Sequence, residues 1–193
     1  MAGARRRGYT ERMRTITRHG SHSRHHERPS VEQDLFAFDW AASGWAGIAA
    51  GAAFILLQTA LVTLFEGGQN TDAIRLIAAI AVGSGALPAA TPLTAIIYLA
   101  AMGVHMILSL IYARILALCI DGMTAQRAVL IGAAFGAGLY ILNYYVFTAV
   151  FPWFAVSRGW ITLTSHVAFG VIAASIYAGM TGHKPEKESP TFH

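Results

Sequence analysis

Charge is scarce in this sequence. Only 12% of its 193 residues are Asp, Glu, Lys or Arg, while 55% are hydrophobic. Soluble domains carry about 25% charged residues, so the composition excludes an ordinary soluble globular protein. Long runs without charge indicate helices that cross a lipid bilayer, because ~20 helical residues span ~30 Å of hydrocarbon.

Other absences exclude several kinds of functional site. Cys119 is the only cysteine, which excludes an intrachain disulfide and any metal or redox motif built on several cysteines. There is no phosphate-binding loop, no nucleophile with a base at a recognisable spacing, and no extramembrane domain to hold an active site. We therefore expect no enzyme, no cofactor, no metal site and no nucleic-acid partner. We also expect no complete proton relay, because the long apolar runs contain no acidic residue.

The apolar runs predict an all-α membrane protein. A transmembrane domain over residues 41–182 is expected to hold four spans, at about residues 44–65, 94–120, 127–151 and 160–180. A fifth apolar segment, at about residues 72–87, has only ~16 residues and is interrupted by glycines. It is too short to cross comfortably, so we expect an interfacial or re-entrant helix in the first outer loop.

Two polar tails flank this domain. Residues 1–40 carry eight arginines but few aliphatic side chains, and we expect them to be disordered and cytoplasmic. Their charge could attract anionic lipid headgroups, at ~1 kcal/mol per basic residue, although setting the topology is the favoured role. Four histidines in this tail could bind a metal loosely, but a solvated tail is favoured because no cysteines or carboxylates accompany them at ligand spacing: His19, His22, His25 and His26. Residues 183–193 form a second polar tail.

The basic residues predict the orientation. With four spans and the amino terminus inside, the cytoplasmic side receives the eight arginines of the tail together with Arg114, Arg127, Lys184 and Lys187. The outer side receives only Arg75 and Arg158. The positive-inside rule therefore predicts that both termini are cytoplasmic.

An internal duplication is predicted from two constant offsets. The first and third spans match at an offset of 85 residues, which pairs the small residues and amides Gly47, Gly51 and Gln58 with Gly132, Gly136 and Asn143. The second and fourth spans match at an offset of 61 residues, which pairs His105, Ser109 and Ala113 with His166, Gly170 and Ala174. Two parallel copies of a helical hairpin are expected, in which the small residues form helix-packing faces.

Four polar side chains are expected in one layer in the outer half of the bilayer: Gln58, His105, Asn143 and His166. One interpretation is structural, with interhelical hydrogen bonds that fix the helix register. A second is a small transporter or a proton or ion conduit, since intramembrane ionisable groups are functional by default. A third is a redox subunit that binds haem or quinone through His105 and His166. The structural interpretation is favoured because of the missing acidic partner.

At these residues the chain resembles a group of small bacterial inner-membrane proteins, the YagU-like proteins. The resemblance covers about residues 45–180 and rests on the glycine-rich segment 45–51, on His105, and on the pattern from His166 to Gly170 with Tyr177 near the end. It implies a four-span protein of the bacterial inner membrane without assigned chemistry. A small, non-enzymatic membrane protein is therefore expected, and it could form a homo-oligomer.

Overall fold

The computed structural model describes residues 38–67 and 71–182 of the chain, and these residues form helices and turns without a strand. The α-helices are α2 (Trp40–Phe65), α3 (Thr71–Val82), α4 (Ala95–Ile120), α5 (Ala125–Ile141) and α6 (Trp160–Thr181). Short 3-10 and π segments connect them: η1 (Ser84–Ala86), η2 (Leu142–Val146), η3 (Phe147–Ala149) and η4 (Pro152–Ser157). The predicted basic and polar tails, with their histidines, lie outside the described residues except for residues 38–40. These three are ordered rather than disordered, since Phe38 is buried, Asp39 caps α2 and Trp40 begins it.

Four helical stretches are long and apolar enough to cross a membrane: Trp40–Glu66, Ala95–Ile120, Ala125–Ala149 and Trp160–Thr181. The shortest has 22 residues, which at 1.5 Å per residue exceeds the ~30 Å of a bilayer core. The chain is a multi-pass membrane protein, as its composition predicted. By contrast, α3 has 12 residues and is too short to cross.

Several helix boundaries differ from the predicted ones for local reasons. α2 begins at Trp40 rather than residue 44, because the Asp39 carboxylate caps it by accepting from the Ala42 amide at 2.9 Å. α3 ends at Val82 rather than residue 87, because Gly83 has φ +87°, which no helix accommodates.

The third span also departs from a uniform helix. Its α-helical part ends at Ile141, and the chain continues as the π segment η2 and the 3-10 turn η3. The expected loop after it is largely a 3-10 helix, η4, with Pro152 at its start, where a missing N–H costs nothing.

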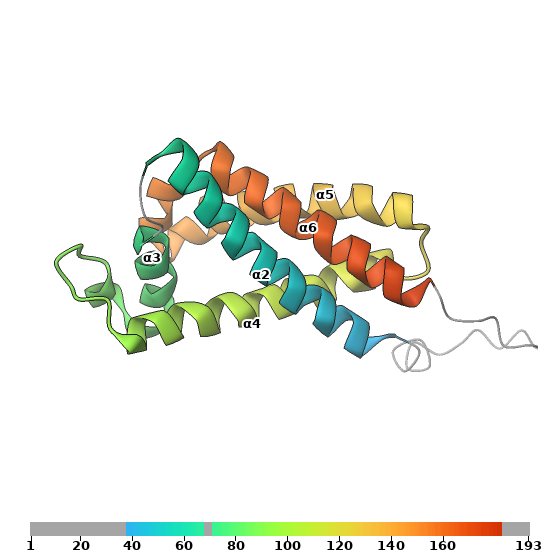
Figure 1. Ribbon diagram of the computed structural model, residues 1–193, viewed down its shortest axis with the longest axis horizontal. Coiled ribbons are helices and arrows are strands. Elements are labelled where there is room, and N and C mark those ends of the chain that lie inside the picture. The colour runs from blue at the N-terminus through green and yellow to red at the C-terminus, as the bar shows by residue number, and fades with distance from the viewer. Residues whose placement is uncertain (1–37, 68–70, 183–193) are drawn as a thin grey trace, which may run out of the picture. The chain divides into compact units, whose positions relative to one another are not determined.

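The spans alternate in direction. α2 packs against both α4 and α6, and α5 packs against α6, whereas α4 and α5 make little contact (Figure 1). We call the end of this bundle that holds Trp40 and Thr181 the tail end and the end that holds Phe65 and Trp160 the loop end. At the tail end, Phe38 stacks on Tyr177 with ring centroids 5.8 Å apart. At the loop end, the rings of Phe65 and Trp160 meet edge to face at 5.1 Å.

The predicted small residues lie at two close helix crossings. A Cβ built on Gly47 would lie 3.0 Å from the Ala113 methyl, and one on Gly51 would lie 2.6 Å from the Ser109 hydroxyl oxygen. On the other hairpin, a Cβ on Gly132 would lie 2.7 Å from the Ala174 methyl, and one on Gly170 would lie 3.0 Å from the Gly136 amide nitrogen. Real Cβ atoms seldom approach to 3.0 Å and essentially never come closer, so glycine permits both crossings.

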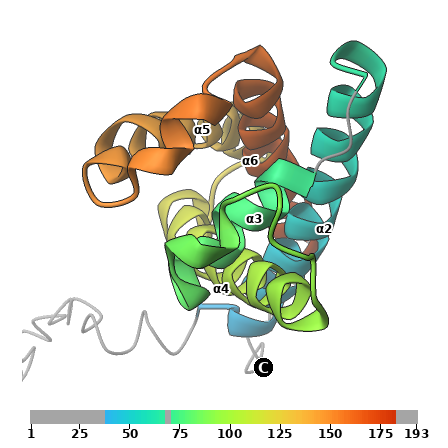
Figure 2. The ribbon, with the colours of Figure 1, turned by 90° about the vertical axis from the view of Figure 1, so that its left-hand side faces the viewer.

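The first loop folds back onto the loop end of the bundle, where α3 lies against α4 (Figure 2). Arg75 of α3 is buried, and its guanidinium donates to three backbone carbonyls, those of Ala86, Pro88 and Ala89, at 3.1–3.3 Å. These bonds close the irregular segment after α3. The Trp153 indole donates to the Leu76 carbonyl at 3.1 Å and so joins η4 to α3.

Candidate intramembrane site

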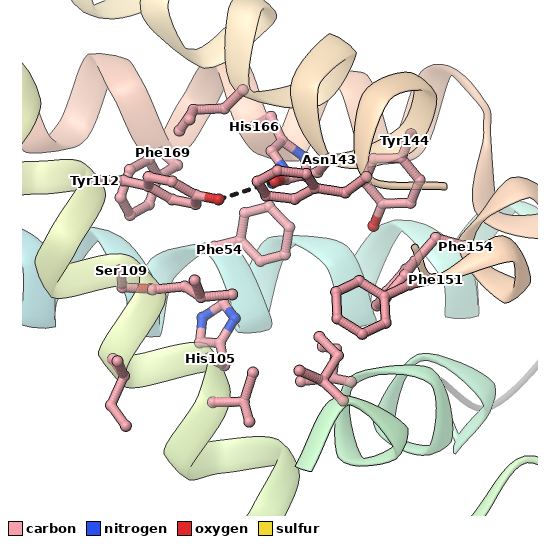
Figure 3. Close-up of a pocket in the computed structure, with 17 residues that line it drawn as sticks. Phe54, His105, Ser109, Tyr112, Asn143, Tyr144, Phe151, Phe154, His166 and Phe169 are labelled. Carbon is pink, nitrogen blue, oxygen red and sulfur yellow. Dashed lines mark hydrogen bonds between the residues drawn. The ribbon is translucent and has the colours of Figure 1, made fainter. Parts of the chain in front are cut away.

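The four polar residues of the predicted layer come from four different segments: Gln58 from α2, His105 from α4, Asn143 from η2 and His166 from α6. Gln58, His105 and His166 lie about 9–15 Å along their helices from the loop end, at 1.5 Å per residue. Figure 3 shows His166 and Asn143 on one side of the Phe54 ring and His105 on the other.

Asn143 and His166 belong to one hydrogen-bond chain. The Tyr112 hydroxyl donates to Asn143 Oδ1 at 2.9 Å, Asn143 Nδ2 and His166 Nε2 are 3.3 Å apart, and His166 Nδ1 lies 2.8 Å from the Thr162 carbonyl. Apart from Glu66 at the very end of the first span, the spans hold no acidic side chain to pair with a charged imidazole, so we take the ring as neutral. Because a carbonyl only accepts, Nδ1 carries the hydrogen, and Nε2 accepts from the Asn143 amide. Both nitrogens of His166 therefore have partners.

Gln58 extends this chain weakly. Its Nε2 lies 3.5 Å from the Thr162 hydroxyl, the upper limit for a hydrogen bond. Its Oε1 is buried without a hydrogen-bond partner in the described part of the chain. Buried amide oxygens are seldom left unpaired, so Gln58 offers an acceptor inside the bundle.

His105 stands apart from the chain. Its Nε2 lies 3.0 Å from the Gly51 carbonyl. The Phe54 ring separates it from His166, with centroids 5.4 Å from the His105 ring and 4.9 Å from the His166 ring. The structure thus brings Asn143 and His166 into direct contact. Gln58 is connected to them through Thr162, and His105 is connected to His166 through the Phe54 ring.

The π segment η2 positions two side chains of the site, Asn143 and Tyr144. A π turn bonds each residue to the fifth one along and widens the helix locally, and such segments often occur at functional sites. Here it carries Asn143, which contacts both Tyr112 and His166, and Tyr144, whose ring meets the His166 ring edge to face at 5.5 Å.

Two adjoining cavities open beside these residues. The first has a volume of about 270 Å³ and lies between α4 and the third span, with Phe54, His166 and Phe169 at its back. The second, of about 300 Å³, lies between α2, α3 and α4 and includes Gln58. They share five wall residues: Phe54, Ile77, His105, Tyr144 and Phe154. The four predicted polar side chains therefore line cavities and are not enclosed between closely packed helices.

The first cavity has walls that reach the lipid-facing surface. Ile107 on α4 and Phe147 on η3 both line it, and they are 59% and 38% exposed. Ile107 lies ~18 Å along α4 from the loop end, at 1.5 Å per residue, which places this edge of the cavity at mid-span. A molecule dissolved in the bilayer would meet the cavity between these two side chains.

The donor set limits which metal or cofactor could bind. Within residues 38–67 and 71–182, no three His, Cys, Asp or Glu side chains gather closely enough to hold a metal ion. Haem held between the two histidines would need a free nitrogen on each, and both nitrogens of His166 are engaged. The residues present do not fit such a haem.

Among the residues of the site that were not singled out from the sequence are Phe54, Tyr112 and Thr162. Phe54 and Thr162 each precede a predicted polar residue by four positions, and Tyr112 follows His105 by seven. Residues at these spacings share a helix face. These residues could therefore have been identified from the sequence, by their helical spacing from the polar residues.

Comparison with models of known protein families, with curated proteins and with solved structures finds no match to this chain. The resemblance to the YagU-like proteins stays a prediction.

Proposed function

We propose that this small integral membrane protein binds a lipid-soluble molecule in the cavity between α4 and the third span, without catalytic activity of its own. The observation that carries the proposal is the cavity of about 270 Å³ at mid-span, mainly apolar and lined by a few polar side chains. Small-molecule sites are typically apolar pockets of about 300–1,000 Å³ with a few placed polar groups. This cavity is slightly smaller than that range and suits a ligand of one or two rings.

A binding site explains features that helix packing alone does not. The hydrogen-bond chain from Tyr112 through Asn143 to His166 holds three polar side chains in fixed positions on the cavity wall. Pure packing contacts would bury these groups between helices, as Gly132 and Gly170 are buried against each other. The polar layer thus fixes helix positions and shapes a pocket at once.

The alternative of a proton or ion conduit is less well supported. A conduit needs polar groups or water along the whole membrane path. Between the cavity and the tail end, the centre of the bundle is filled largely by apolar side chains that are at least 98% buried, namely Ala113, Leu116, Ala117, Ala128, Ala173 and Ala174. This dry core favours a closed pocket over a passage.

Binding can be tested with tritiated 1-methoxynaphthalene and the full chain in lipid nanodiscs, using scintillation proximity and empty nanodiscs as the partition control. We expect saturable binding that Leu108→Trp weakens at least tenfold, because Leu108 lines the cavity. Ile111→Trp is the matched control, because this side chain is exposed on the same helix and does not line the cavity. Binding no greater than that of empty nanodiscs, or equal in the two variants, would refute the proposal.

We further infer that the domain is a duplicated hairpin. Matching positions make matching contacts: Gly47 meets Ala113 as Gly132 meets Ala174, and Gly51 meets Ser109 as Gly136 meets Gly170. α2 and α5 run in one direction and α4 and α6 in the other, as a parallel repeat requires. In this scheme α3 belongs to an insertion in the first copy and lies at the outer membrane interface.

We also propose that the protein resides in a bacterial inner membrane with both termini cytoplasmic. The distribution of basic residues in the sequence supports this orientation, since twelve of the fourteen belong to the segments before Trp40 and after Thr181 or are Arg114 and Arg127. Green fluorescent protein fused after His193 is then expected to fluoresce, whereas alkaline phosphatase fused there is expected to be inactive. The reverse pattern would overturn the topology.

A further inference from the structure

We infer that the ligand carries a hydroxyl group on a small aromatic ring system, and that His105 accepts the hydrogen bond of that hydroxyl. This inference rests on the proposed function and names the ligand class that the site would select.

The hydrogen-bonding role of His105 follows from its fixed partner. Its Nε2 lies 3.0 Å from the Gly51 carbonyl oxygen, and a carbonyl can only accept. Nε2 must therefore carry the hydrogen, and in the neutral ring Nδ1 is left with a lone pair and no hydrogen. Towards a ligand, His105 is an acceptor only.

Nδ1 is available to a ligand. His105 lines both cavities, and no described residue hydrogen-bonds to its Nδ1. Ser109, one helical turn away, packs its hydroxyl against Gly51 on the opposite helix. A hydroxyl group entering the cavity would therefore find an acceptor that has no internal partner.

His105 Nδ1 differs from most other polar groups of the first cavity, which already take part in hydrogen bonds. Both nitrogens of His166 and both polar atoms of the Asn143 amide are engaged in the chain, and the Tyr112 hydroxyl donates within it. The Tyr144 hydroxyl has no hydrogen-bond partner among the described residues, and as a rotating O–H it can serve a donor or an acceptor. His105 Nδ1 is thus the histidine nitrogen of this cavity that is left without a partner, and it can only accept.

The cavity walls favour a flat ring. Phe54, Tyr144, Phe154 and Phe169 all line the first cavity, and aromatic pairs gain from offset-stacked or edge-to-face geometry. Phenols and quinols satisfy both requirements. A quinone or a methyl ether has the ring but no hydroxyl hydrogen, so it leaves Nδ1 unpaired.

The test compares three probes of similar size on the full chain in nanodiscs: 1-naphthol, 1-methoxynaphthalene and 1,4-naphthoquinone. Affinities are corrected for partition into empty nanodiscs. We expect 1-naphthol to bind on the order of tenfold more tightly than the ether, since a buried acceptor left unpaired costs about that factor. The quinone, used as a competitor, should behave like the ether.

Two variants separate hydrogen bonding from shape. His105→Phe keeps a ring but removes the acceptor, so the preference for 1-naphthol should vanish while the affinity for the ether is kept. His105→Gln can donate to the Gly51 carbonyl and still present an oxygen, so it should retain a preference even if the phenylalanine variant folds poorly. Gel filtration monitors the folding of both variants.

The outcomes distinguish the two proposals. Equal affinity for 1-naphthol and the ether in the wild type, or a preference that survives in His105→Phe, overturns the hydroxyl inference and leaves the lipid-soluble pocket standing. Binding of all probes that Leu108→Trp does not reduce overturns both. Tighter binding of the quinone than of 1-naphthol would also refute the inference, because the acceptor on His105 would then not select the ligand.

Discussion

The tightest helix crossing gives the sharpest test of the fold. A Cβ placed on Gly136 would lie 2.8 Å from both the His166 carbonyl carbon and the Val167 Cα, and closer still to the His166 oxygen. Non-bonded carbon atoms prefer about 3.5–4.0 Å, and these neighbours are backbone atoms that cannot rotate away. In Gly136→Ala, α5 and α6 must therefore separate by roughly 1 Å.

The expected cost follows from which atoms must move. Overpacking typically costs 1–3 kcal/mol, and we expect Gly136→Ala to lose about 3 kcal/mol of unfolding free energy. Gly51→Ala should lose less, about 2 kcal/mol. Two of the atoms that its Cβ would meet, Ser109 Oγ at 2.6 Å and Met106 Cε at 3.0 Å, can adopt other rotamers, although the Ser109 Cβ at 2.9 Å moves only with its backbone. Gly138→Ala is the matched control on α5: nothing lies within 4 Å of its Cβ, so it should be neutral or gain up to about 1 kcal/mol of helix propensity.

The assay is unfolding in mixed micelles by titration with sodium dodecyl sulfate, followed by tryptophan fluorescence. The reasoning predicts an order of stability, with Gly138→Ala highest, Gly51→Ala intermediate and Gly136→Ala lowest. If Gly136→Ala unfolds at the same detergent fraction as Gly138→Ala, the close approach of α5 and α6 is wrong.

Three further substitutions test individual contacts. Arg75→Met removes a guanidinium that serves three carbonyls; limited proteolysis should then cut residues 83–93 faster, and an unchanged pattern would contradict the closure of this segment. Tyr177→Phe removes a hydroxyl that donates to an Asp121 carboxylate oxygen at 2.7 Å, and should lower the unfolding free energy by about 1.5–3 kcal/mol; equal stability would show that the bond contributes nothing. Trp153→Phe keeps an aromatic ring but loses the bond to Leu76; amide exchange in α3 should rise about fivefold, from a loss of ~1 kcal/mol, and unaltered exchange would disprove that link.

The four spans were predictable because hydropathy is a local property of the chain. Each span is a mostly apolar run of more than 20 residues, and in lipid such a run has to be helical. The small-residue faces were predictable for a related reason: Gly132, Gly136 and Gly170 recur at helical spacing, and close helix packing in membranes requires small side chains.

The interior of the site was not predictable in the same way. Phe54 and Tyr112 lie in apolar runs, where composition alone does not distinguish a lipid-facing aromatic ring from one that lines a cavity. The π segment from Leu142 to Val146 contains no glycine or proline to announce it, so nothing local marked it. Arg75 was counted as an outer basic residue, and its burial became evident only when the loop carbonyls that surround it were placed.

The sparse contact between α4 and the third span has a mechanical consequence. One of the few links across this seam is the hydrogen bond from Tyr112 to Asn143, whereas each of the two helices is anchored firmly to a different neighbour. A ligand bound between α4 and the third span would contact both of them and so hold the two parts of the bundle together. Ligand binding should therefore raise the free energy of unfolding by about 2.7 kcal/mol when the ligand is present at one hundred times its dissociation constant. This gain would be seen as a higher melting temperature.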